Sequence, residues 1–351
     1  MKAARLHGPE DLRVEEVAEP ERPGAGQILI RVGAIGICGS DLHMYGTGAI
    51  GGEEIASPMI MGHEFMGVAL ELGEGARDGE NRELKVGQRV AVEPACPCYR
   101  CECCEQGHPN LCPNHTFYGV YPTDGAVCEK MIVEARNCFL MPDEISNAGG
   151  ALLETLGVAI HAVDLGKLKV AHSIAVVGCG PVGLLIMKLA LLMGCREVYV
   201  FDKYEWRVDL ACRWGAHKAF RVEEGEGVDL LMKETGGRGV DVCFEAAWAD
   251  ESVQQSADMT RYGGRLVLVG IPPDDRLFMR HATARRKGLT IMMARRMKHT
   301  YPRAIKLTSG ENPQINLDEM VSEIFPIEKT AEAYAKNYAY AEGVQKLVIQ
   351  P

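Results

Sequence analysis

Four cysteines in one short segment have the spacing of a metal-binding cluster. They are separated by two, two and seven residues: Cys98, Cys101, Cys104 and Cys112. The segment, CYRCECCEQGHPNLC, is rich in polar residues, glycine and proline, so it is poorly suited to bury free thiols. Four thiolates around Zn²⁺ form a closed tetrahedral site with no position left for water, which predicts a structural zinc. Cys96 and Cys103 fall outside this spacing and are predicted to be spectators.

The cysteine content as a whole also favours metal over disulfides. Six of the thirteen cysteines lie between Cys96 and Cys112. The N-terminal sequence MKAARLHGPEDLRVEE lacks the basic, apolar and small-residue zones of a secretion signal. Cytosolic thiols stay reduced, so we expect a cytoplasmic protein whose clustered cysteines bind metal.

Two further segments carry residues that suit a second zinc ion. CGSDLH begins at Cys38, and GHEFMG contains His63 and Glu64, while Glu154 lies in LLETLGVAIHA. Together they offer a thiolate, an imidazole and carboxylates, all of which are zinc ligands. Each residue is ordinary when taken alone, because a lone buried cysteine usually behaves as a small apolar side chain.

A glycine-rich segment has the pattern of a dinucleotide-binding loop, and it lies between an expected strand and an expected helix. Its residues are Gly178, Cys179, Gly180, Pro181, Val182 and Gly183. In this pattern the first glycine permits a tight turn, the second lets the pyrophosphate approach the backbone, and the third lets helix and strand pack closely. The helix N-terminus then binds the phosphates.

The next expected strand ends at Asp202, where a carboxylate would accept hydrogen bonds from the adenosine ribose. A carboxylate there repels a 2′-phosphate, which favours NAD over NADP. Lys203 and Arg207 lie nearby, so some use of NADP stays open, and Arg207 is a further candidate cofactor contact.

The elements that must position these groups divide into two kinds. Residues 1–150 contain short apolar runs such as 27–37 and 89–94 between glycine- and proline-rich turns, which predicts a β-barrel or sandwich. From residue 173 strands and helices alternate, which predicts a parallel sheet covered on both faces. The expected strands are 173–178, 197–202, 217–220, 240–247, 264–270 and 288–294, and the expected helices are 181–193, 205–214, 226–235 and 251–260.

The last part of the chain returns to mixed elements. We expect a helix after Tyr301, a strand near 319–327, a helix at 328–337 and a final strand at 345–351. The prediction is therefore that residues 1–155 and 295–351 form one domain and residues 156–294 form the other.

Composition excludes several classes of protein. A net charge of −10 with dispersed basic residues argues against nucleic acid as a partner, because such binding needs clustered Lys and Arg. No apolar run is long enough to cross a membrane. The chain is long enough for two cores, and 47% apolar with 25% charged residues is typical of a globular protein.

Taken in order, CGSDLH, GHEFMG, the four spaced cysteines and GCGPVG resemble the zinc-containing medium-chain alcohol dehydrogenases along essentially the whole chain. Glu64 directly after His63, and Glu154 in ETLGVAIHA, resemble the sorbitol and threonine dehydrogenases. The resemblance implies an α/β protein with a GroES-like β-barrel catalytic domain, whose zinc lobe spans about 93–115, and a Rossmann domain that binds NAD. It also implies that Cys38, His63 and either Glu64 or Glu154 hold the catalytic zinc. Thr155 replaces the proline found in many relatives.

The resemblance further implies a mechanism. Zinc acts as a Lewis acid that lowers the pKa of an alcohol, whose carbon passes hydride to the nicotinamide. Ser40 and His43 match a relay that carries the released proton toward solvent. A packed histidine without such a role is an equally open interpretation of His43.

Substrate contacts are also implied by position. Phe117 matches an aromatic residue beside the substrate, and Arg296 matches an arginine that contacts polyol hydroxyls. The basic neighbours of Arg296 leave a carboxylated or phosphorylated sugar alcohol open, and they also suit a solvated or interfacial loop. The main hypothesis is a polyol or cyclitol dehydrogenase. The alternatives are a threonine dehydrogenase and a non-catalytic NAD-binding protein. Relatives suggest a homo-oligomer, a dimer or a homotetramer, that acts on a small-molecule alcohol.

Overall fold

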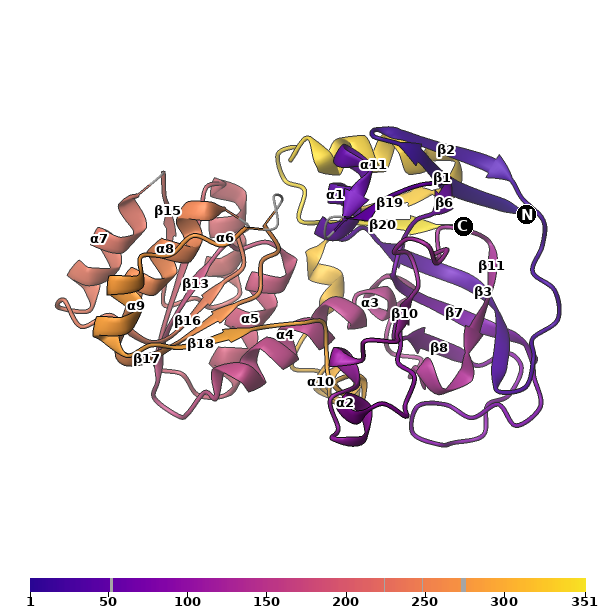
Figure 1. The fold of residues 1–351 in the computed structure, drawn as a ribbon, viewed down its shortest axis with the longest axis horizontal. Coiled ribbons are helices and arrows are strands. Elements are labelled where there is room, and N and C mark those ends of the chain that lie inside the picture. The colour runs from indigo at the N-terminus through magenta and orange to yellow at the C-terminus, as the bar shows by residue number, and fades with distance from the viewer. Residues whose placement is uncertain (51–52, 224, 248, 273–275) are drawn as a thin grey trace. The chain divides into compact units, whose positions relative to one another are not determined.

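Two separate sheets organise the chain in the computed structural model, which describes residues 1–50, 53–223, 225–247, 249–272 and 276–351. One sheet belongs to a unit formed by Met1–Thr155 and Tyr301–Pro351, here called unit 1. The other belongs to unit 2, formed by Leu156–Thr300. The chain therefore builds most of unit 1, then all of unit 2, and then returns to unit 1 (Figure 1).

Unit 2 contains a six-stranded parallel sheet of order β15-β14-β13-β16-β17-β18. Its strands are β13 (Ser173–Val177), β14 (Glu197–Asp202), β15 (Lys218–Arg221), β16 (Val240–Glu245), β17 (Thr260–Leu268) and β18 (Thr290–Met293). Its helices are α4 (Leu153–Gly166), whose first residues belong to unit 1, α5 (Pro181–Leu192), α6 (Glu205–Arg213), α7 (Glu226–Glu234), α8 (Asp250–Met259) and α9 (His281–Lys287). The predicted parallel sheet is confirmed, whereas α9 was not predicted.

The strand order places helices on both faces of this sheet. Strand β14 lies on one side of β13, and β16 and β17 lie on the other. Crossovers between parallel strands are right-handed. The connection from β13 through α5 to β14 and the connection from β16 through α8 to β17 step in opposite directions along the sheet, so α5 and α8 cover opposite faces. Val176 in β13 and Val200 in β14 are consequently buried completely.

The amino ends of three strands in unit 2 are held together by a partly buried carboxylate. Asp241 accepts hydrogen bonds from Arg261 Nε at 2.6 Å, from Arg238 at 2.7 Å and from the Ser173 amide and hydroxyl at 2.9 and 3.0 Å. Burial alone would raise the pKa of Asp241, but the hydrogen bonds outweigh it and hold this pKa well below its usual range. The charged form therefore stabilises unit 2.

Replacing Asp241 with asparagine should lower the free energy of unfolding by about 2 kcal/mol at pH 7, the scale of hydrogen bonds to a charged group. Because the folded-state pKa is depressed, this contribution is present above about pH 4, the unfolded value, and is lost as the pH falls further. Thermal unfolding of both proteins at pH 7, 5, 4 and 3 measures the difference. A difference in stability between the two proteins that is as large at pH 3 as at pH 7 would contradict the assignment.

Unit 1 is built mainly from antiparallel strands, as expected for a GroES-like domain, and β19 and β20 form its parallel pair. A seven-stranded sheet has the order β12-β8-β7-β3-β20-β19, with β11 also paired to β3, and β2-β1-β6 forms a smaller sheet. The strands are β1 (Lys2–Gly8), β2 (Asp11–Glu16), β3 (Gln27–Gly36), β4 (Ala49–Ile50), β5 (Glu53–Glu54), β6 (Met59–Ile60), β7 (Glu64–Leu72), β8 (Arg89–Val92), β9 (Ala95–Cys96), β10 (Thr116–Phe117), β11 (Lys130–Glu134), β12 (Cys138–Leu140), β19 (Val321–Pro326) and β20 (Lys346–Gln350).

The helices of unit 1 are short. They are α1 (Gly39–Thr47), α2 (Glu102–Glu105), α3 (Asn147–Ala151), α10 (Tyr301–Thr308) and α11 (Thr330–Tyr338). Turns of 3-10 helix occur at Pro109–Leu111, Ala135–Asn137, Leu317–Met320 and Ile327–Lys329. Within the described residues, no helix combines the length and apolar character needed to cross a membrane.

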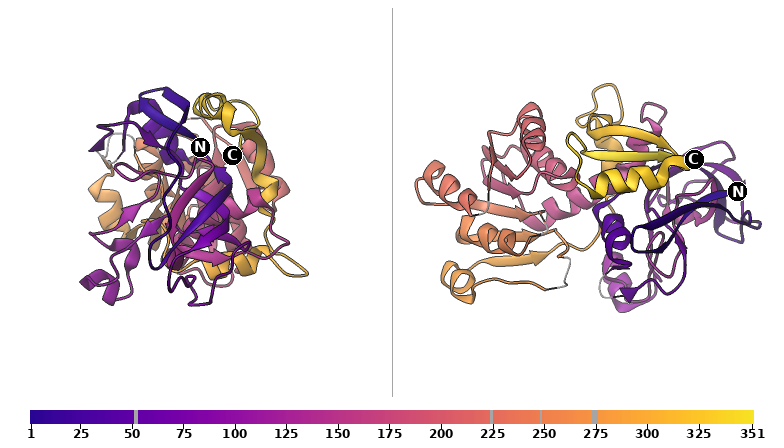
Figure 2. Two further views of the ribbon diagram at one scale, coloured as in Figure 1. Left: turned by 90° about the vertical axis from the view of Figure 1, so that its right-hand side faces the viewer. Right: turned by 90° about the horizontal axis from the view of Figure 1, so that it is seen from above.

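The last strand of the chain, β20, is inserted between two other strands of the unit 1 sheet. Strand β20 pairs antiparallel with β3 through Val348 and Gly36, and parallel with β19 on its other side. Figure 2 shows the C-terminal helix α11 lying beside these two strands. The apolar side of β20, including Leu347 and Ile349, is part of the buried core of unit 1. Residues near the C-terminus therefore form an interior strand of the sheet, between the edge strand β19 and β3 from the first 70 residues.

Candidate metal centres and dinucleotide loop

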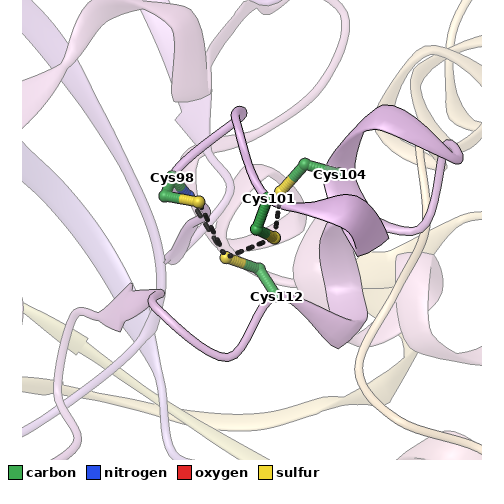
Figure 3. Close-up of side chains that lie close together, drawn as sticks. All are labelled: Cys98, Cys101, Cys104 and Cys112. Atoms are coloured by element: carbon green, nitrogen blue, oxygen red, sulfur yellow. Dashed lines mark hydrogen bonds between the residues drawn. The ribbon is translucent and has the colours of Figure 1, made fainter.

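The four spaced cysteines converge in unit 1 (Figure 3). The Sγ atoms of Cys98 and Cys112 are 3.5 Å apart, those of Cys101 and Cys112 are 3.8 Å apart, and those of Cys101 and Cys104 are 3.5 Å apart. The Cys98 amide also donates to the Cys112 sulfur at 3.3 Å. Thiols at these separations can share one tetrahedral ion, with every position filled by sulfur.

The thiols of this lobe do not behave as independent side chains. A backbone hydrogen bond from Arg100 lowers the pKa of Cys98 to about 6, while desolvation raises the pKa of Cys104 to about 12. Cys96 and Cys103 are not members of the four-sulfur group. Cys96 lies instead in β9, paired with Thr116 of β10. The lobe has the donor set of a closed, structural zinc site.

A second group of metal-ligand atoms lies where β3 ends and β7 begins. Cys38 precedes α1, His63 immediately precedes β7, and Glu64 is the first residue of β7. One ligand atom from each lies within 4.8 Å of the other two. Strand pairing explains the convergence, because Gly36 of β3 lies opposite Glu64 of β7 and brings Cys38 to the same place.

Asp41 contacts two members of this group, His63 and Cys38. It is completely buried on α1, and its Oδ1 lies 3.1 Å from His63 Nδ1. Its Oδ2 accepts the Cys38 amide hydrogen at 3.0 Å, which also caps the start of α1. Burial opposes protonation of His63, but Asp41 and Cys38 outweigh it and raise the pKa of this histidine well above its ordinary value. The Nε2 atom of His63 is thereby left to face a ligand, as in carboxylate–histidine–metal arrangements.

Glu64 is held by two features that sequence reasoning did not identify. A side chain at Gly36 would collide with Glu64 Oε2, so glycine is required there by close approach rather than by a turn. Lys346 of β20 places its Nζ 2.6 Å from each carboxylate oxygen of Glu64. Both charged side chains are almost fully buried.

Glu154 lies near this group but outside it. Its carboxylate is buried in the first turn of α4 and is not among the three ligands within 4.8 Å. Burial raises the pKa of Glu154 to about 7, with Glu64 and Asp41 adding to the shift and His63 and Lys346 opposing it. A second carboxylate, Glu93, faces the same region, and burial together with the charge of Glu154 raises its pKa to about 8.

The other predicted catalytic and substrate residues of unit 1 are distributed around His63. Ser40 Oγ lies 3.4 Å from His63 Nε2, and the ring of Phe117 in β10 lies 5.4 Å from the imidazole. His43 is half-buried on α1, one turn after Gly39. Asp41, Ser40 and His43 therefore share one helix, although no helix was predicted in this segment.

The donor set fits zinc. A thiolate, an imidazole oriented by a carboxylate, and a carboxylate seated against Gly36 are all zinc ligands. Three protein ligands leave one tetrahedral position for another oxygen, which is the arrangement of catalytic rather than structural zinc. The four-cysteine group therefore has no free coordination position, whereas the group of Cys38, His63 and Glu64 has one.

In unit 2 the glycine-rich loop joins β13 to α5. Gly178 has a φ of 93°, and a side chain there would also approach the backbone of Ala246 and Ala247. Gly183 on α5 lies so close to the Gly178 carbonyl that a side chain would collide with it. Pro181 occupies the first turn of α5, where its missing N–H costs nothing. Gly180 and Val182 complete a loop that opens directly onto the helix N-terminus, as phosphate binding requires.

Asp202 ends β14 beside this loop. Its two oxygens accept the amide hydrogens of Cys179 at 2.7 Å and Tyr204 at 2.9 Å. Arg207 NH1 lies 3.7 Å from the same carboxylate, and it also lies beside Gly180. One acid and one base thus flank the predicted phosphate loop.

Arg296, the second predicted substrate residue, belongs to unit 2, whereas the metal-ligand group belongs to unit 1. Its backbone has a φ of 56°, in the left-handed region. Its neighbour Met297 is buried, which anchors this segment.

Comparison with known proteins agrees with this architecture. Residues 24–143 match the alcohol dehydrogenase GroES-like domain, and residues 181–310 match the zinc-binding dehydrogenase domain. The sorbitol dehydrogenase of Bacillus subtilis (strain 168) is 33% identical over all of this chain and 97% of its own, and that of Homo sapiens is 34% identical over 94% and 90%. The crystal structure of 2R,3R-butanediol dehydrogenase from Bacillus subtilis has a TM-score of 0.86 at 30% identity, covering 100% and 99% of the two chains.

A GroES-like unit joined to a parallel dinucleotide-type sheet defines the medium-chain dehydrogenases. The chain belongs to the zinc-binding alcohol dehydrogenase family, and the resemblance to sorbitol dehydrogenases drawn from its motifs is confirmed.

Proposed function

We propose that the chain is a zinc- and NAD-dependent dehydrogenase that oxidises a secondary alcohol of a polyol, cyclitol, or sugar acid or phosphate. The observation that carries the proposal is the convergence of Cys38, His63 and Glu64 within 4.8 Å in unit 1. A binding protein without catalytic activity has no use for such an open ligand set. The sorbitol dehydrogenases that the chain resembles support the polyol class.

The proposed roles follow from the contacts of each residue. Cys38, His63 and Glu64 hold the ion, and Glu154 is the alternative carboxylate beside them. Zinc bound there supplies a Lewis acid that makes an alcohol hydroxyl easier to deprotonate. Ser40, next to His63 Nε2, accepts the hydroxyl proton while giving its own hydroxyl proton onward, and His43 on the same helix carries that proton away from the site. Phe117 covers the ligand face of His63 and excludes water.

The hydride acceptor in this proposal is NAD, bound by residues 178–183 with its ribose on Asp202. Replacing Asp202 with alanine should weaken NAD binding by roughly tenfold to a hundredfold, the range of hydrogen bonds to a charged group, and leave NADP binding unchanged or improved. Calorimetric titration with both cofactors measures this, with Asp209→Ala on the exposed side of α6 as the control. Tighter binding of NADP than NAD to the unaltered protein would contradict the assignment.

A substrate panel tests the proposed class. Sorbitol, xylitol, arabinitol, inositols, sugar acids, sugar phosphates and L-threonine are each supplied with NAD, and NADH absorbance is followed. We expect turnover of at least one polyol or polyol derivative. Oxidation of L-threonine with no activity on polyols would establish the amino-alcohol alternative. An acid or phosphate preference would assign a substrate role to Arg296 and its basic neighbours.

We further propose that the protein is a cytoplasmic homotetramer. Strand β18 is the last strand of its sheet, and Met293 at its end is 64% exposed, so this edge offers a surface to a second copy. All thirteen cysteines lie in the described residues and are free thiols, which suits a reducing compartment. Light scattering coupled to size exclusion gives the assembly mass.

A further inference from the structure

Lys346 is a buried cation within a region of negative charge. It is 2% exposed in β20. Its Nζ lies 2.6 Å from Glu64 Oε1, 2.6 Å from Glu64 Oε2 and 2.9 Å from the carbonyl oxygen of Ile37. An ammonium has three N–H groups. The ammonium therefore lies within contact distance of three oxygens, two of them on Glu64.

The surroundings keep this ammonium charged. The two carboxylate oxygens of Glu64 at 2.6 Å and the Ile37 carbonyl oxygen at 2.9 Å replace the water that burial removes from the ammonium. Removing the partner of a buried charge is strongly unfavourable, because the remaining charge has neither water nor a counter-ion. Glu64 therefore depends on Lys346 whenever no metal is present.

The same carboxylate is a ligand in the metal group. A zinc ion and an ammonium on one carboxylate repel each other, and each reduces the negative charge available to the other. Gly36 carries no side chain at the place that Glu64 Oε2 occupies, so the carboxylate reaches its observed position through this gap. The contact with Lys346 acts on the charge of this same carboxylate.

Resting on the proposed function, we propose that Lys346 is a positioning residue that competes with the catalytic metal for Glu64 and so sets how tightly the ion is held. Removing the ammonium eliminates the competitor and also destabilises the metal-free protein. Both effects act in the same direction, toward tighter metal binding. A lysine that served only to support the sheet would, when removed, loosen the site or leave it unchanged.

The test measures zinc affinity by competition with a chromogenic chelator on the full-length protein. Lys346→Met should bind the ion of the Cys38 site more tightly by roughly tenfold or more, because the repulsion between the ammonium and the ion is removed. Lys346→Arg, which keeps the charge, should stay within about threefold of the unaltered protein. The matched control is Lys287→Met, because Lys287 is a partly buried lysine of unit 2 that donates only to carbonyl oxygens at the end of α8.

Every outcome decides the proposal. Weaker or unchanged zinc binding by Lys346→Met would overturn it, as would an arginine variant that behaves like the methionine variant. If Lys346→Met folds only in zinc-supplemented medium, the proposal is supported, and Lys346→Gln then provides the affinity measurement. If replacing Cys38 removes no zinc from the protein, the proposed function itself is wrong. This result is distinguishable from an unchanged zinc affinity in Lys346→Met, which overturns only the role of Lys346.

Discussion

Replacing Cys38 with serine should remove one of about two zinc ions per chain and lower kcat by roughly a thousandfold or more. The expected count follows from one closed and one open site. The loss in rate reflects the several kcal/mol that a metal contributes to a transition state, with each 1.4 kcal/mol equal to a factor of ten. Cys38 provides the thiolate of the three-residue group, so its removal leaves an imidazole and one carboxylate that is already paired with Lys346.

Metal analysis of purified protein and NADH absorbance measure the two effects. The matched control is Cys128→Ala, since Cys128 is a fully buried thiol of unit 1 that lies outside both ligand groups. This control should keep both ions. A Cys38→Ser protein that retains two zinc ions and full turnover would refute the assignment of the catalytic site.

Replacing Cys112 with serine should instead remove the other ion and lower the unfolding temperature by about 10 °C. Cys112 is the buried member of the four-cysteine lobe, and its sulfur contacts both Cys98 and Cys101. The binding energy of a structural zinc contributes directly to folding. For a domain of 150 to 250 residues, each 1 kcal/mol corresponds to about 2 to 4 °C.

Scanning calorimetry and metal analysis measure this loss, and Cys103→Ser in the same lobe is the control that should change neither quantity. The catalytic ion should stay in the Cys112→Ser protein, and freshly prepared enzyme should still turn over. If Cys112→Ser keeps its unfolding temperature and both ions, the lobe does not hold a structural zinc.

The fold class could be predicted because its signals are local or periodic. Apolar strands alternating with helices from residue 173 onward define the parallel sheet, and the strand at Glu197–Asp202 has the predicted bounds. Strand β17 begins at Thr260, earlier than expected, because its pairing with β16 is irregular between Val240 and Val242. An irregular register of this kind leaves no mark in the hydrophobic pattern.

The members of the four-cysteine lobe could be proposed together because they are close in sequence. Lys346 and Gly36 could not, since their roles depend on contacts between distant strands. Lys346 meets Glu64 across 282 positions of sequence, and in the sequence it is one polar residue at the start of a final strand. Gly36 looks like one of several glycines in an apolar strand, and only the pairing of β3 with β7 shows that Glu64 fills the missing side chain's place.

No helix was predicted around Asp41, because residues 1–150 were expected to form short strands and turns; the structure places this residue on α1, next to the metal ligands. The segment after Cys38 is a nine-residue helix. It contains two glycines, Gly39 and Gly46, which weaken the helical signal. Its start is stabilised by the contact of Asp41 with the Cys38 amide, which a periodicity argument does not detect.

The position of β20 inside the unit 1 sheet, between β3 and β19, has a consequence for biosynthesis. During translation the four-cysteine lobe emerges early and can load its ion on the ribosome, because all its ligands lie between residues 98 and 112. The ion-pair partner of Glu64 is instead among the last residues translated. Cys38, His63 and Glu64 emerge even earlier than the lobe, so the open ligand group should meet zinc without the competing ammonium of Lys346 until the last strand has been translated.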